Sequence, residues 1–174
     1  MTDLTAALAG HQLEVREYRP GMDFDCSRHD LVVLSGGGGE GLEIEDEHQP
    51  GKLWYEDEIR FIKQCKKPII GICMGFEVIC TAYGAKVSKM KQGIDQIFVE
   101  FKTTAEGKKL LKKAKLNQFE AHDWHVTKAP KGFKVLAESE AGIEVIQHQS
   151  KPIFAVQFHP EKGGTLTLPK LLSL

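Results

Sequence analysis

Apolar side chains recur along this chain at two spacings, and each spacing predicts its own kind of element. Residues 55–67 place Tyr55, Ile59, Ile62 and Cys65 on one side of a helix. Helices are predicted at 4–11, 55–67, 75–84 and 108–115. Short apolar or alternating runs bounded by turn residues predict strands at 13–18, 31–34, 68–73, 85–90, 97–102, 133–140, 143–149 and 152–161.

The order of these elements indicates the fold class. Helices and strands alternate in the first half, which favours an α/β domain with a mostly parallel central sheet flanked by helices. The second half is rich in strands and favours an added antiparallel portion. One domain, residues 1–174, is expected. Domains of this class usually open with a buried strand, whereas this chain begins at helix 4–11. The first strand is therefore expected to be missing, which would leave apolar surface exposed at 31–34.

Composition adds few constraints. The chain is 41% hydrophobic and 27% charged, and its net charge is −1. These values give no general argument for binding nucleic acid or a membrane. No apolar run approaches the roughly 20 residues of a membrane span, and residues 1–18 lack the apolar segment of a signal peptide. A cytoplasmic location is therefore expected.

The cysteine and histidine spacings do not predict a metal centre. None of the four cysteines belongs to a CxxC pair, so a zinc knuckle is not expected. Cys65 and Cys80 lie in apolar context and are expected to be reduced core residues. His122 and His125 are three positions apart and lack a third ligand nearby in the sequence. The chain is therefore predicted to bind no metal and no cofactor.

Cys73 is the first candidate for catalysis. The segment KPIIGICMGFEVIC, 67–80, reads as a buried strand that turns sharply into a helix at Cys73. Gly71 and Gly75 would permit a strained turn, as in hydrolases that expose a nucleophile at a strand-to-helix elbow. A helix N-terminus favours the thiolate, so a lowered thiol pKa is expected.

His159 and Glu161 supply the expected base. The segment AVQFHPE, 155–161, ends another apolar strand, which would place His159 at the same edge of the sheet as Cys73. Glu161 is two residues further on and can turn back onto the imidazole. A nucleophile, a base and an orienting carboxylate are the elements of a catalytic triad.

A glycine loop completes the candidate site. The segment LSGGGGEG, 34–41, follows a buried strand and can bring backbone N–H groups close to a ligand. An oxyanion needs such donors, and the amide of Met74 can add another. A phosphate loop is disfavoured because no Gly-Lys-Ser/Thr follows and no GxGxxG opens a helix.

Together these segments resemble the class I, triad-type glutamine amidotransferases. The motifs LSGGGG, GICMGFE and FHPE occur in the family's order, and residues 131–161 most resemble the amidotransferase domain of GMP synthase. The resemblance implies a flavodoxin-like architecture and hydrolysis of L-glutamine to glutamate and ammonia. The ammonia would pass to a synthetase partner, and no cofactor is implied for this half-reaction.

The resemblance also implies residue roles. Cys73 would attack the side-chain amide and form a γ-glutamyl thioester. His159 would protonate the departing ammonia and then activate water, and Glu161 would hold His159. Family positions whose backbone lines the oxyanion and substrate pocket match Gly37, Gly39 and Met74. Family positions in the loop that holds the α-amino and carboxylate groups of glutamine match His122, Asp123 and Trp124.

One position departs from the family motif Gly-x-Cys-x-Gly-x-Gln. Glu77 stands where the family has a glutamine that contacts the substrate. A carboxylate cannot donate a hydrogen bond when ionised, and its charge would raise the pKa of a neighbouring thiol. Two alternatives therefore stay open: a hydrolase of another γ-glutamyl compound, whose amine Glu77 would bind, and a non-catalytic binding or regulatory module.

Overall fold

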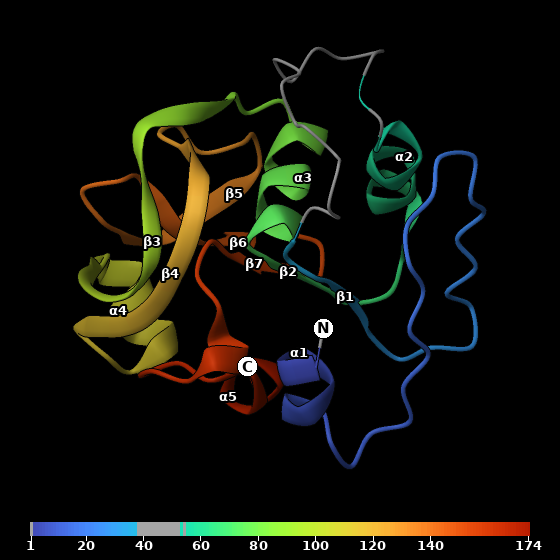
Figure 1. The fold of residues 1–174 in the computed structure, drawn as a ribbon, viewed down its shortest axis with the longest axis horizontal. Coiled ribbons are helices and arrows are strands. Elements are labelled where there is room, and N and C mark those ends of the chain that lie inside the picture. The colour runs from blue at the N-terminus through green and yellow to red at the C-terminus, as the bar shows by residue number, and fades with distance from the viewer. Residues whose placement is uncertain (1, 38–52, 54) are drawn as a thin grey trace.

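The computed structural model describes residues 2–37, 53 and 55–174, and it places seven strands in one mixed sheet (Figure 1). The strand order is β1-β2-β7-β6-β5-β3-β4. The strands are β1 (Val32–Leu34), β2 (Ile69–Ile72), β3 (Val87–Thr103), β4 (Lys115–Val126), β5 (Phe133–Glu138), β6 (Ile143–His148) and β7 (Ile153–Val156). The helices are α1 (Thr2–Ala7), α2 (Glu56–Gln64), α3 (Met74–Ala82), α4 (Ala105–Leu111) and α5 (Leu168–Leu172), with a 3₁₀ turn, η1 (Pro160–Lys162).

The parallel part of the sheet consists of β1, β2 and β7 and is covered on both faces. Ile69 of β2 packs into a core with residues of α2 and α3. Its neighbour Ile70 packs into a second core that includes residues of α1 and α5. Successive side chains of a strand point to opposite faces, so the continuous apolar run of β2 supplies both cores. Figure 1 shows α2 and α3 on one side of these strands and α1 and α5 on the other.

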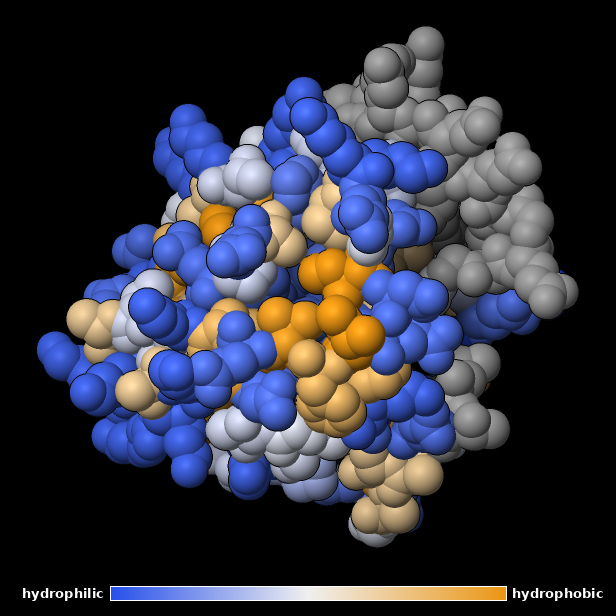
Figure 2. All heavy atoms as spheres, turned by 60° about the vertical axis from the view of Figure 1, so that its left-hand side comes forward, coloured by the Kyte–Doolittle hydropathy of each residue, from blue (hydrophilic) through white to orange (hydrophobic). Residues whose placement is uncertain are grey.

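The antiparallel part consists of β6, β5, β3 and β4. β3 and β4 form a long hairpin whose register shifts between Lys89 and Ile94 and again between Ile94 and Ile97. Figure 2 shows this side of the molecule, which is largely hydrophilic around one apolar area. β3 carries two large apolar side chains that are about half exposed, Ile97 and Phe98.

The predicted fold class is confirmed, but the antiparallel portion is larger than expected, with four of six strand pairings. The predicted strands 85–90 and 97–102 belong to one strand, β3. The helix predicted at 108–115 is α4, which ends at Leu111. β4 was not predicted, and the predicted strand 13–18 is wrong because these residues form coil.

The sheet edge at β1 agrees with the expected lack of an opening strand. Among the described residues β1 pairs with β2 alone, and Leu31 and Val33 remain half-buried. A cavity of about 450 Å³ lies between this edge and the coil that includes Tyr18. Within the described part of the chain, no helix is long and apolar enough to cross a bilayer.

Candidate active site

Cys73 occupies the sharp turn between β2 and α3, as the sequence predicts. Its backbone has φ 51° and ψ −110°, which is unusual for a residue with a side chain. Its N–H donates to Val156 O of β7 at 2.9 Å. A Cβ on Gly75 would lie 2.3 Å from Leu34 O, so α3 can pack against β1 only if this residue is glycine. The local sequence therefore builds a strained elbow at the thiol.

His159 follows the end of β7 and is oriented by Glu161. The His159 Nδ1–H donates to Glu161 Oε1 at 2.7 Å, and both side chains are largely buried. The His159 backbone N–H also donates to Phe119 O of β4 at 2.9 Å. Because Nδ1 is engaged by the carboxylate, Nε2 is the nitrogen left for proton transfer.

The thiol and the imidazole converge at Gly36. A Cβ built on Gly36 would lie 2.9 Å from Cys73 Cβ, 3.5 Å from Cys73 Sγ and 3.1 Å from His159 Cε1. Two segments 86 positions apart in the sequence therefore meet beside one glycine. The Cys73 thiol donates a long hydrogen bond to Ala121 O at 3.9 Å.

The expected lowering of the Cys73 pKa is wrong for this structure. The residue is 8% exposed, and burial raises the pKa of its thiol well above the ordinary value. The negative charge of Glu77 raises it further, as the sequence predicts, and the Met74 backbone N–H opposes the rise only in part. The thiol is therefore neutral at rest, because burial outweighs the helix N-terminus.

Glu77 is buried beside this site and has a partner from the strand that leads to His159. Gln157 Nε2 donates to Glu77 Oε1 at 2.9 Å. Glu77 is 5% exposed, and burial raises the pKa of its carboxyl group to about 7. Gln157 Oε1 is buried without a hydrogen-bond partner among the described residues. An amide at position 77 could donate to that oxygen, whereas a carboxylate cannot.

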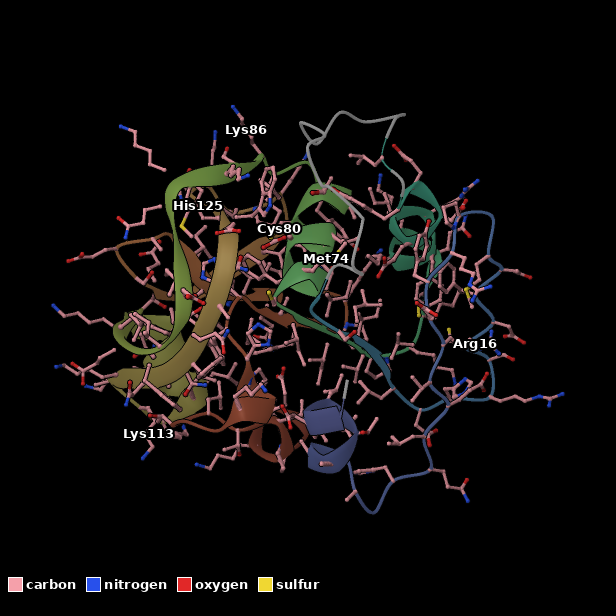
Figure 3. All side chains as sticks on the ribbon, in the orientation of Figure 1. Arg16, Met74, Cys80, Lys86, Lys113 and His125 are labelled. Atoms are coloured by element: carbon pink, nitrogen blue, oxygen red, sulfur yellow. The ribbon has the colours of Figure 1, made fainter. Side chains whose placement is uncertain are left out.

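The glycine loop contributes a residue that the prediction missed. Gly36 faces the thiol and the imidazole, while Gly37 adopts φ +102° next to it. Gly39 lies outside the described residues. Met74 is the first residue of α3, where Figure 3 labels its half-buried side chain. The cavity beside β1 extends to Gly36, Gly37 and Met74 and therefore reaches this cradle.

The predicted substrate loop 121–124 is part of a strand, β4, instead of a loop. His122 is buried and donates from Nδ1 to Trp124 O at 2.7 Å. Asp123 is exposed and lies over the irregular part of β3, because a Cβ on Gly93 would lie 1.8 Å from its Oδ1. Ala121, which was not predicted, brings its carbonyl to the Cys73 thiol.

Comparisons with known proteins agree with this geometry. A family model described as glutamine amidotransferase class-I matches residues 6–174. A GMP synthase (glutamine-hydrolyzing) subunit from Methanocaldococcus jannaschii is 35% identical over 109 residues, which cover 58% of this chain and 54% of that protein. The protein of the same name from Saccharolobus solfataricus is 32% identical over 147 residues, covering 81% of this chain and 72% of that protein.

A solved structure shares the fold. A glutamine amidotransferase from Thermotoga maritima superposes with a TM-score of 0.63 and 22% identity, over 80% of this chain and 60% of that chain. The alignment with the M. jannaschii protein covers about half of that relative's length, 54%.

Proposed function

Because the chain belongs to the class-I glutamine amidotransferase family, we propose that it hydrolyses L-glutamine to glutamate and ammonia through a cysteine thioester. The observation that carries this proposal is the convergence of the Cys73 thiol and the His159 imidazole beside Gly36. Glu161 holds the imidazole by its Nδ1–H, which leaves Nε2 to exchange protons with the sulfur and the substrate.

The first half of the reaction forms the thioester. His159 Nε2 removes the Cys73 proton as the sulfur attacks the side-chain amide carbon of glutamine. The negative charge that develops on the amide oxygen is stabilised by backbone N–H groups of the Gly36–Gly37 segment and Met74. The imidazolium then protonates the amide nitrogen, the C–N bond breaks and ammonia leaves.

The second half releases glutamate. Neutral His159 removes a proton from water, and the resulting hydroxide attacks the thioester carbon. The C–S bond breaks, the sulfur recovers its proton from the imidazolium, and glutamate dissociates. A neutral resting thiol fits this scheme, because the proton leaves the sulfur only when a substrate is present to receive the attack.

A synthetase is the proposed recipient of the ammonia. The relatives from M. jannaschii and S. solfataricus are named as glutamine-hydrolyzing subunits of GMP synthase, which supports a GMP synthase-like synthetase as the partner. Ammonia that leaves His159 would be consumed by that partner. Turnover that increases on addition of the candidate synthetase would support this assignment.

Covalent labelling tests the glutaminase proposal. A diazo-ketone analogue of glutamine should alkylate the chain at Cys73, and peptide mass mapping should locate the adduct there. The Cys73→Ala variant should not be labelled, and Cys80→Ala is the matched control because Cys80 is buried in α3 away from the cradle. A wild-type chain that remains unlabelled with and without candidate synthetases would favour the non-catalytic alternative.

Glu77 supports a second candidate, the hydrolysis of another γ-glutamyl compound. Its buried carboxyl group lies one helical turn from Cys73, where the family has an amide. A cationic amine on the leaving group would pair with this carboxylate better than glutamine does. A panel of γ-glutamyl amides compared with glutamine separates the two candidates by kcat/KM.

A further inference from the structure

Three ionisable side chains form a buried cluster behind the proposed nucleophile. Glu120 and His122 are two residues apart on β4 and therefore point to the same face of the strand. Glu144 of β6 joins them, and one donor atom from each residue lies within 4.8 Å of the other two. The exposed fractions are 1% for Glu120, 7% for His122 and 1% for Glu144.

Several polar atoms of this cluster lack hydrogen-bond partners among the described residues. They are Glu120 Oε1, Glu120 Oε2, His122 Nε2 and Glu144 Oε2. His122 Nε2 approaches Glu120 Oε2 to 3.1 Å, but the contact does not have hydrogen-bond geometry. Buried polar atoms without partners are costly, so this concentration requires an occupant that satisfies them.

The surrounding hydrogen bonds direct these free atoms toward one another. His122 Nδ1–H donates to Trp124 O at 2.7 Å, which leaves the lone pair on Nε2. Ser139 Oγ–H donates to Glu144 Oε1 at 2.5 Å, which leaves Oε2 free. A histidine whose other ring nitrogen donates to a backbone carbonyl is the usual arrangement of a metal ligand.

We propose that Glu120, His122 and Glu144 bind one divalent transition-metal ion of the Zn²⁺ type. One imidazole nitrogen and two carboxylates form a three-ligand set that such ions accept, with a fourth position for water. The sequence did not suggest this set because it pairs His122 with Glu120 and with a distant strand, instead of with His125. The proposal is independent of glutamine hydrolysis.

The ion would act as a positioning element instead of a reactant. Ala121 lies between Glu120 and His122, and its carbonyl accepts the hydrogen bond of the Cys73 thiol. An ion that joins β4 to β6 would fix this carbonyl relative to the elbow. Protons shared between the carboxyl groups are the competing occupant, since burial raises the pKa of Glu120 to about 7 and that of Glu144 to about 8.

Titration with Co²⁺ tests the site. Protein freed of metal by chelation should bind about one equivalent, with d–d absorption and no thiolate-to-cobalt charge-transfer band, and Zn²⁺ should displace it. The absence of that band matters because Cys26 Sγ and Cys65 Sγ lie 3.4 Å apart and could bind metal themselves. Stoichiometric Co²⁺ binding should persist in the Cys26→Ser variant.

Variants assign the binding to the cluster. Glu120→Gln and Glu144→Gln should each weaken Co²⁺ binding by about 100-fold. Glu138→Gln is the matched control, because Glu138 is an exposed carboxylate of β5 paired with Ile143 beside the cluster, and it should bind as the wild type does.

Wild-type measurements keep the proposal testable if a variant fails to fold. The thermal midpoint of the wild-type chain should rise when chelator is replaced by Zn²⁺. Absence of Co²⁺ binding by the wild type, a thiolate band, or unchanged affinity in folded Glu120→Gln protein would each overturn the proposal. In the first case, protons would be the occupant of the cluster.

Discussion

Replacing Glu77 by glutamine tests how a buried carboxyl group affects both stability and the nucleophile. Burial raises the pKa of Glu77 from 4.5 to about 7 in the folded protein. A raised pKa means that ionisation is disfavoured by folding, so this residue lowers stability once the pH exceeds 4.5. The loss grows as the pH rises toward 7 and then stays constant.

The magnitude follows from the size of the shift. A change of about 2.5 pKa units corresponds to roughly 3 kcal/mol in favour of Glu77→Gln at pH 8 and to about zero below pH 4.5. The variant amide can also donate to the unpartnered Gln157 Oε1, which adds stability at every pH. Urea denaturation of both proteins at pH 4.5, 6 and 8 measures the difference.

Turnover provides the second measurement. Glu77→Gln removes a charge that raises the Cys73 pKa, so glutamine turnover should increase. Glu58→Gln is the matched control, because burial also raises the pKa of Glu58 to about 7 but Glu58 lies on α2. It should gain stability with pH and leave turnover unchanged. A pH-independent stability difference for Glu77→Gln would refute the electrostatic reasoning, and unchanged turnover in an active enzyme would refute the link to the thiol.

Three further substitutions probe the site and its scaffold. Glu161→Gln should lower kcat by about 10³-fold, because the imidazole loses its orienting carboxylate, and steady-state kinetics would show unchanged turnover if that role were wrong. Gly36→Ala should lower kcat by about 100-fold with little change in KM or in the urea midpoint, because its methyl group would press on Cys73. Gly75→Ala should lower the free energy of unfolding by about 3 kcal/mol, because its Cβ would lie 2.3 Å from Leu34 O, and a midpoint equal to wild type would contradict that contact.

Residues 13–18 and 115–126 show where sequence patterns fail. The segment LEVREY alternates apolar and polar residues, but it forms coil because a strand also needs a partner, and none of the described residues pairs with it. β4 escaped prediction because its buried face is partly polar: Gln118, Glu120 and His122 alternate with more exposed residues. Gln118 is satisfied there by two hydrogen bonds to the Leu166 backbone, a long-range arrangement that hydropathy cannot reveal.

The sequence alone determined the elbow at Cys73 and the histidine that follows β7, because apolar runs that end in glycine or in His-Pro are local signals. It also determined the pairing of His159 with Glu161, which are only two residues apart. Tertiary structure decided the rest. It placed Gly36 at the convergence point, it buried the thiol deeply enough to raise its pKa, and it brought Glu144 against β4. Those properties depend on distances and desolvation between segments far apart in the chain, which packing sets and local sequence does not.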